Sequence, residues 1–293
     1  NVYHGACVLQ HVVRPTGLLR APNINREAEV YLKTENWQNT GSFKLRGAYY
    51  KISQLSEEEK AKGVIACSAG NHAQGVALAA QHSGIPAIIC IPDGAPISKV
   101  EATKSYGAQV ELVKGVYDDA YNRAVELQKE RNLTFIHPFN DPDVIAGQGT
   151  IGLELLKQLP DMDAVIVPVG GGGLISGVAF AIKSLNPKCK VYGVQAAGAA
   201  SMKASLEQNG PHSLTGVSTF ADGIAVKCPG DLTYELCSKY VDDVVTVSDD
   251  ETATAILALI EQQKLITEGA GAVAVAAAMF NKVDVKGNKV ACI

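Results

Sequence analysis

The chain lacks the features that mark several common protein classes. Its seven cysteines include no Cys-x-x-Cys pair, so we expect buried, reduced thiols rather than a disulfide framework or a zinc site. Its 26 Lys and Arg residues are outnumbered by 30 Asp and Glu. Without a basic patch, neither nucleic acid nor an anionic membrane is expected as a partner. The longest apolar run, residues 270–280, is shorter than the roughly 20 residues of a membrane span.

The two ends of the sequence lead to two further expectations. No charged start followed by an apolar run marks a signal peptide, and we therefore expect a cytoplasmic protein. At the other end, Val290–Ile293 has the composition of a strand, but no turn, cap or polar tail follows it. We expect the natural chain to continue beyond this segment.

Short apolar runs alternate with longer helical patterns along the chain. This alternation predicts an α/β fold with parallel sheets that helices cover on both faces. The expected helices are Gly75–His82, Tyr117–Glu130, Val178–Lys183 and Thr252–Lys264, and capping boxes at Ser56/Glu59 and Ser248/Glu251 mark two further helix starts. The expected strands are Val30–Lys33, Val64–Cys67, Ala87–Ile91, Val110–Val113, Ala164–Val167, Val191–Val194, Val244–Val247 and Val290–Ile293.

The length of 293 residues favours two domains, since one domain typically has roughly 100–200 residues. No repeat or linker separates them, so the boundaries fall at crossings within one body. We expect a large domain formed by residues 1–63 and 144–293, with a small domain, residues 64–143, inserted between its parts.

The clearest binding signal is a run of glycines between an expected strand and an expected helix. It consists of Gly170, Gly171, Gly172 and Gly173, followed by Leu174. Without Cβ atoms this backbone can turn sharply and direct several N–H groups to one point. The following helix N-terminus adds partial positive charge. The sequence therefore predicts a phosphate-binding loop here.

Two nucleotide-binding motifs do not fit this loop. A G-x-G-x-x-G pattern starting at Gly170 or Gly171 would need a third glycine where Ile175 or Ser176 stands. A Walker loop would need Gly-Lys-Ser/Thr at its end, and no such tripeptide follows. Dinucleotide and triphosphate ligands are therefore disfavoured.

A second candidate is Lys44, within the segment NTGSFKLRGA of residues 39–48. It stands among Phe43, a leucine and two glycines at an expected helix start. A partly apolar pocket disfavours the charged form of an amine, which lowers its pKa and leaves it able to form a Schiff base.

A third candidate is the turn Ser68, Ala69, Gly70, Asn71 and His72 between a strand and a helix. Its free N–H groups suit a carboxylate, and the Asn71 amide can donate to an oxygen on a ring. An ordinary capped helix start is the alternative interpretation. Taken alone, His72 is better explained as a core or helix-face histidine than as a catalyst.

Considered together, these motifs resemble those of the threonine dehydratase and serine racemase family, most closely its catabolic threonine ammonia-lyases. The resemblance runs from residue 14 to residue 293 and rests on SFKLRGA, SAGNHAQG, AGQGT, PVGGGGLISG and TEGAGA, in that order. It implies the two-domain, fold-type-II pyridoxal-phosphate architecture of the tryptophan synthase β chain. It also implies a homodimer or homotetramer.

The resemblance implies a role for each motif. Lys44 would bind pyridoxal 5′-phosphate covalently, with Phe43 packed beside it. The N–H groups of residues 170–174 would hold the cofactor phosphate, and Asn71 would hydrogen-bond the 3-hydroxyl of its ring. Residues 68–72 would bind the substrate carboxylate.

The implied reaction is β-elimination on a small amino acid. Lys44 would remove the α-proton, and the cofactor phosphate would protonate the leaving hydroxyl. L-Threonine would give 2-oxobutanoate and ammonia, and L-serine would give pyruvate and ammonia.

The sequence departs from the wider family in three places. Ala69 stands where racemases have a serine that handles protons on the ring face opposite the lysine, which disfavours racemisation. The stretch 194–201 has no carboxylate, so we expect no strong divalent-metal site of the racemase type. The family's serine that meets the pyridine nitrogen would follow Ile293.

Three other functions stay open at this point. One is a serine racemase with side dehydratase activity, and another is a β-replacement synthase on the same fold. The third is a non-enzymatic phosphate- or nucleotide-binding module, which would leave Lys44 and Asn71 unexplained.

Overall fold

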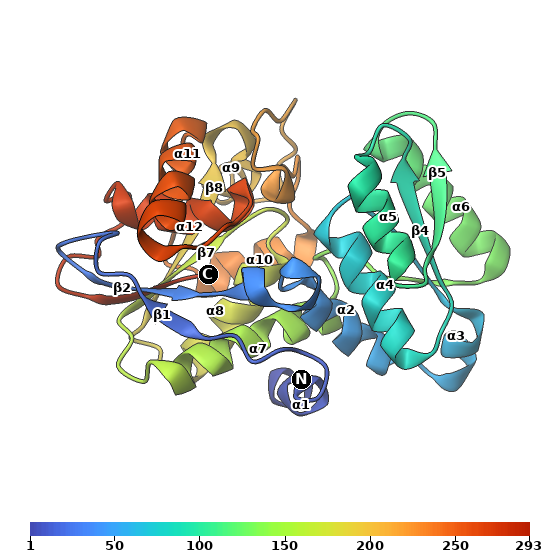
Figure 1. Cartoon of the computed structure of the whole chain (residues 1–293), viewed down its shortest axis with the longest axis horizontal. Helices are drawn as coiled ribbons and strands as arrows, with labels where there is room; N and C mark the ends of the chain where they lie inside the picture. Colours follow the sequence, from blue (N-terminus) through green and yellow to red (C-terminus); the bar gives the residue numbers. More distant parts are fainter.

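Two β-sheets lie side by side in the computed structural model, which describes residues 1–293 (Figure 1). The larger sheet has the strand order β1-β2-β10-β7-β8-β9, and the smaller has the order β5-β4-β3-β6. Neighbouring strands are parallel except β1 and β2. The strands are β1 (Leu18–Arg20), β2 (Glu29–Lys33), β3 (Val64–Cys67), β4 (Ala87–Pro92), β5 (Gln109–Val113), β6 (Thr134–Phe135), β7 (Ala164–Pro168), β8 (Lys190–Ala196), β9 (Asp243–Val247) and β10 (Lys289–Cys292).

Twelve α-helices surround the sheets. They are α1 (Val2–Leu9), α2 (Lys44–Ser53), α3 (Glu57–Lys62), α4 (Asn71–Ser83), α5 (Ile97–Ser105), α6 (Tyr117–Arg131), α7 (Pro142–Gln158), α8 (Gly173–Leu185), α9 (Ser201–Glu207), α10 (Asp231–Tyr240), α11 (Asp249–Ala258) and α12 (Gly269–Met279). The short turns of helix are η1 (Glu35–Trp37), η2 (Asn39–Gly41), η3 (Ala197–Ala199), η4 (Asp222–Ile224) and η5 (Leu259–Gln263).

Each sheet has a core on both faces because successive residues of a strand point to opposite sides. In β7, Ala164 and Ile166 join the core formed with α12, whereas Val165 and Val167 join the core formed with α7 and α8. In the smaller sheet, β3 divides its residues in the same way between α4 on one face and α6 on the other. Burial on both faces explains why the central strands are apolar throughout.

The eight expected strands are all present. Strands β1 and β6 were not predicted, because their lengths of three and two residues are too short to show a pattern. The sheets are parallel as expected, except that β1 runs antiparallel to β2 at one edge. The strand β5 lies at the other sheet's edge and leaves Leu112 54% exposed.

The helices also follow the expectations with one correction. Both capping boxes form, with reciprocal hydrogen bonds at Ser56 and Ser248. The helix expected over residues 252–264 instead ends at Ala258 and continues as the wider turn η5. The η5 turn ends at Gln263, because the next residue, Lys264, adopts a left-handed backbone, φ 57°. No helix combines the length and apolarity that crossing a membrane requires.

All seven cysteines are free, and no disulfide forms. Five of them are buried, as expected for reduced core thiols, but Cys7 is exposed and Cys228 is only partly buried. Burial raises the pKa of the Cys67 thiol to about 12, so this group stays protonated and unreactive.

The division into domains stays a prediction, although the two sheets fall on either side of it. Helix α2 complicates it. The division assigns α2 to the large domain, yet Leu45, Ala48 and Ile52 of α2 belong to a core of the smaller sheet. The same helix also packs against α7, so it bridges the two sheets.

A cluster of ion pairs also holds α2 in place; its members are Lys33, Glu35, Arg46 and Glu154. The Arg46 side chain is fully buried and donates two hydrogen bonds of 2.9 Å to the carboxylate of Glu35. Its Nη1 donates to Glu154 of α7 at 2.6 Å. Lys33 donates to the other oxygen of Glu154 at 2.6 Å. Two cations and two carboxylates therefore neutralise one another beneath the start of α2.

We predict that Arg46→Met strongly destabilises the protein. It would leave the Glu35 carboxylate buried without its cation, and breaking a buried pair in this way costs about 3–5 kcal/mol. The exposed pair of Lys104 with Glu101 provides the control, since Lys104→Met should cost at most about 0.5 kcal/mol. Urea denaturation followed by circular dichroism measures both, and equal midpoints for the two variants would contradict the prediction.

Candidate active site

The chain turns sharply just before Lys44. Thr40 and Gly41 both have left-handed backbones, with φ of 67° and 71°. This conformation is strained for a β-branched residue such as Thr40. The turn reverses the chain after η1 and places Lys44 as the first residue of α2. Phe43 precedes it, and its ring centroid lies 5.5 Å from Lys44 Nζ.

The Lys44 side chain is partly buried and forms no salt bridge. Its Nζ donates a hydrogen bond of 2.9 Å to the carbonyl oxygen of Pro138. Burial lowers the pKa of Lys44 from 10.5 to about 8, while the Glu268 carboxyl acts in the opposite direction. Lys44 therefore has a larger neutral, nucleophilic fraction near neutral pH than an exposed lysine, as its sequence context predicted.

The glycine loop joins β7 to α8 and presents unpaired backbone donors. None of the N–H groups of residues 170–175 donates to an acceptor within the protein, whereas that of Ser176 donates to the carbonyl of Gly172. The carbonyl of Gly171 is held elsewhere by the Thr233 hydroxyl, at 2.6 Å. A row of free donors at a helix N-terminus is an anion site.

The structure adds a second reason, close packing, why these positions are glycine. A Cβ on Gly172 would lie 2.6 Å from Met202 Cε, and its φ of 95° suits only glycine. A Cβ on Gly171 would lie 2.4 Å from the Phe139 ring, and one on Gly173 would lie 2.8 Å from Phe139 Cα. The glycines thus allow the loop to pack closely against protein, and this packing exposes their N–H groups.

The turn of residues 68–72 joins β3 to the start of α4. Ser68 Oγ accepts the N–H of Gly70 at 3.1 Å. The N–H groups of Ala69, Asn71 and His72 donate to no acceptor in the protein. Free N–H donors at a helix N-terminus favour an anion, and the assignment of this turn to the substrate carboxylate stays a prediction.

This turn lies beside the start of α2. A Cβ on Gly75, one helical turn further along α4, would lie 3.0 Å from the main chain of Lys44. The turn and the lysine are therefore brought together by the packing of α4 on α2.

The His72 side chain points into the core rather than into the site. It is buried, and its Nε2 lies 2.8 Å from the carbonyl oxygen of Ile136. Burial, with the Lys44 ammonium nearby, lowers the pKa of His72 to about 3. The neutral ring therefore donates to Ile136, and only the backbone N–H of His72 is left to bind a ligand.

Glu268 is a site residue to which the sequence analysis gave no role. It lies at the start of α12 and its Oε1 accepts a 2.6 Å hydrogen bond from the Asn71 amide. Burial raises the pKa of Glu268, and its charge acts on Lys44. The TEGAGA motif contained this carboxylate, but sequence alone could not show that it meets Asn71.

In residues 194–201, which match the racemase metal site, the amide side chain of Gln195 already binds the nearby backbone carbonyls. Gln195 is fully buried, and its Nε2 donates to the carbonyl oxygens of Val169 and Ala199 at 3.2 and 3.3 Å. Its Oε1 accepts the N–H of Lys203 at 2.9 Å. The side chain thereby partners the backbone carbonyl just after β7 and the one at the end of η3. No three His, Cys, Asp or Glu side chains gather in an arrangement suited to a metal ion.

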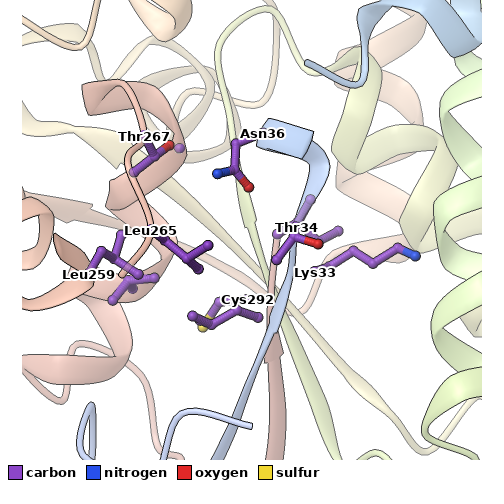
Figure 2. A pocket seen from close by; sticks show the side chains of 11 residues that line it. Lys33, Thr34, Asn36, Leu259, Leu265, Thr267 and Cys292 are labelled. Carbon is purple, nitrogen blue, oxygen red and sulfur yellow. The ribbon is translucent and has the colours of Figure 1, made fainter. Parts of the chain in front are cut away.

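Two cavities lie outside this site. Figure 2 shows one of about 40 Å³, bordered by residues such as Thr34, Leu259 and Cys292, with the Lys33 amine pointing away from it. It has room for about one water molecule. A larger polar hollow of about 330 Å³ lies beside Lys51 and the edge strand β6. Neither cavity contains Lys44 or the glycine loop.

The partly buried amine of Lys44 and the two groups of free N–H donors together indicate an enzyme that binds a phosphorylated aldehyde. Residues 9–293 match the family of pyridoxal-phosphate dependent enzymes, and the chain belongs to this family. Its residues fit the cofactor, because six consecutive orphaned N–H groups face no protein acceptor and Lys44 supplies the amine.

Within this family, the chain is similar to threonine ammonia-lyases and to a serine racemase. An L-threonine ammonia-lyase of Thermotoga maritima is 58% identical over 287 residues, which cover 97% of this chain and 71% of that protein. The processed form of threonine deaminase isoform 2 from Solanum lycopersicum superposes with a TM-score of 0.94 at 41% identity, covering 100% of this chain and 83% of that one. Maize serine racemase gives a TM-score of 0.96 at 36% identity, with coverage of 100% and 90%.

We predict that Gly172→Ala weakens pyridoxal-phosphate binding at least about tenfold. A left-handed backbone costs alanine about 1–2 kcal/mol. Without cofactor the loop can relax and avoid this strain, but binding the cofactor would impose it again, so the strain would be subtracted from the binding free energy. The control is Gly84→Ala, at the end of α4, where φ is also positive (66°) but no atom lies within 4 Å of the new Cβ. Titration with pyridoxal phosphate gives the dissociation constants. An unchanged value for Gly172→Ala would count against the loop as the phosphate site.

We also predict that the enzyme needs no divalent metal ion. Gln195 already partners the carbonyls of Val169 and Ala199, and the region offers no carboxylate ligand. Treatment with EDTA should leave most of the activity in place. Complete loss of activity that magnesium restores would show this prediction to be wrong.

Proposed function

We propose that this chain catalyses the β-elimination of L-threonine, and of L-serine, to a 2-oxo acid and ammonia. The observation that carries the proposal is the partly buried amine of Lys44, whose hydrogen-bond acceptor is a neutral carbonyl, together with two groups of free backbone N–H donors. The names of its relatives support the substrate class. The reaction makes it a carbon–oxygen lyase.

The two groups of donors separate two negative charges. The N–H groups of residues 170–175 hold the cofactor phosphate at the start of α8. Those of Ala69, Asn71 and His72 hold the substrate carboxylate at the start of α4. Because helix N-termini favour anions, substrate and cofactor are oriented mostly by backbone, and few side chains are left exposed to the reacting atoms.

Side chains supply the remaining chemistry. Bound pyridoxal phosphate supplies the electron sink that makes the substrate's α-proton removable. The Lys44 amine, whose pKa of about 8 lies near the working pH, accepts that proton as general base. One N–H of the Asn71 amide is engaged by Glu268, and the other remains to donate to the cofactor's ring hydroxyl. Loss of water across the α and β carbons and hydrolysis of the enamine then release 2-oxobutanoate or pyruvate with ammonia.

We further propose that the protein acts in the cytoplasm as a homodimer or homotetramer. Seven free cysteines are typical of a reducing compartment. Closed symmetry is the usual form of a soluble oligomer. Light scattering on the purified chain measures the number of subunits, and a monomer would exclude this assembly.

We predict that borohydride reduction fixes the cofactor on Lys44. The purified protein should be yellow, and reduction should bleach its visible band irreversibly. Peptide mass spectrometry should place the reduced adduct on Lys44. Lys51 in the same helix is a built-in control, because Asp141 and Asp143 hold its amine by ion pairs of 2.8 and 3.3 Å. Lys44→Ala should abolish turnover and keep the circular dichroism spectrum, whereas an adduct on Lys51 would overturn the assignment.

We predict deamination with little racemisation. Racemisation needs a proton donor on each face of the reacting carbon, and Ala69 has no exchangeable proton to oppose Lys44. Elimination needs only the lysine and a leaving hydroxyl, so it survives with alanine at this position. With L-serine as substrate, pyruvate should form much faster than D-serine, as followed by coupled reduction and chiral chromatography.

The matched variant Ala69→Ser tests the reason for this outcome. It should raise the share of D-serine among the products. Formation of D-serine as fast as pyruvate by the unaltered enzyme would favour the racemase alternative.

A further inference from the structure

Residues 137–140, between β6 and α7, touch both halves of the site. The carbonyl oxygen of Pro138 accepts the hydrogen bond from Lys44 Nζ. The next residue, Phe139, packs against Gly171 and Gly173 so closely that neither could carry a Cβ. Asn140 Oδ1 accepts the N–H of Leu232 in α10 at 3.1 Å. No motif of the sequence pointed to this segment.

The His137 imidazole organises the segment. Its Nδ1 accepts the N–H groups of Phe139, at 3.2 Å, and Asn140, at 2.8 Å. Because Nδ1 accepts these N–H groups through its lone pair, it carries no proton, and the proton of the neutral ring is on Nε2. Burial and the Lys44 ammonium lower the pKa of His137 to about 4, against the opposing charge of Asp141. The ring therefore remains neutral and able to accept.

A single peptide unit connects His137 to the lysine. The peptide bond between Pro138 and Phe139 has its C=O on Lys44 Nζ and its N–H on His137 Nδ1. Because a peptide bond is planar, rotating this unit breaks both hydrogen bonds together. The proline ring fixes φ at Pro138, so the remaining freedom is the orientation of this plane, which His137 holds.

We propose that His137 is a positioning residue of this active site, which orients the Pro138–Phe139 peptide and thereby fixes both the Lys44 amine and the packing of the glycine loop. The proposal rests on the proposed function, since it concerns the lysine and the loop that hold the cofactor. His137 acts through Pro138 and Phe139.

The test compares His137→Asn with His137→Leu in the holoenzyme. Asparagine can place its Oδ1 near the position of Nδ1 and accept the same N–H groups, whereas leucine has no acceptor. In His137→Leu, pyridoxal phosphate should dissociate at least about tenfold faster, and kcat should fall by a similar factor, because both hydrogen bonds that His137 Nδ1 accepts are lost. KM for L-threonine should change less than about threefold, since the carboxylate site at α4 is untouched. His137→Asn should restore most of both losses.

Two further variants keep the comparison fair. His137→Gln is as polar as His137→Asn, but its longer side chain places the acceptor on the Nε2 side, and it should behave like His137→Leu. If His137→Leu does not fold, the comparison of His137→Asn with His137→Gln tests the proposal in its place. His82→Leu, at the exposed end of α4, is the matched control and should change neither cofactor release nor kcat.

Two results would overturn the proposal: cofactor release unchanged in His137→Leu, or equal effects of Asn and Gln at position 137. Failure of the proposed function shows differently. A protein whose Lys44 holds the cofactor but which leaves threonine and serine intact would refute the elimination reaction, while its cofactor release would still report on His137.

Discussion

The structure depends on two neighbouring cations with different partners: Arg46 is paired with carboxylates, whereas Lys44 is not. Arg46 and Lys44 lie on the same helix, two residues apart; Arg46 is fully buried and Lys44 is partly buried. Arg46 meets Glu35 and Glu154 with ideal geometry, which keeps its pKa raised and fixes α2. Lys44 meets only a carbonyl oxygen directly, so burial lowers its pKa to about 8. The cluster that stabilises the helix thus allows the same helix to hold a reactive amine.

Around that amine, the fold places positive potential by means of the backbone. Parallel strands end at the same edge of a sheet, and the helices that follow β3 and β7 begin with unpaired N–H groups. Two anions can therefore be bound without adding cationic side chains, which would lower the basicity of Lys44 further. The carboxylate of Glu268 acts in the other direction on the lysine pKa and accepts a hydrogen bond from Asn71. The balance of these charges keeps the amine usable near neutral pH.

Local patterns in the sequence predicted the parts of this structure that local physics determines. Apolar runs predicted the central strands, capping boxes predicted two helix starts, and the glycine run predicted free N–H groups. The short strands β1 and β6 were missed because two or three residues carry no period. The approach of Glu268 to Asn71 was missed because it joins positions 197 residues apart. The buried partners of Arg46 were missed for the same reason, since the charges of Glu35 and Glu154 look like surface charges in sequence.

The segments that cross between the two sheets explain why the site forms where it does. Backbone groups in a crossing segment have no sheet or helix partner and must find one elsewhere when buried. After η1, the crossing reverses through Thr40 and Gly41 and delivers Lys44. After β6, the crossing presents the Pro138 carbonyl, whose partner is that same lysine. The requirement to satisfy buried backbone therefore brings the two crossings together, and the amine that satisfies the second crossing is the one that the reaction uses.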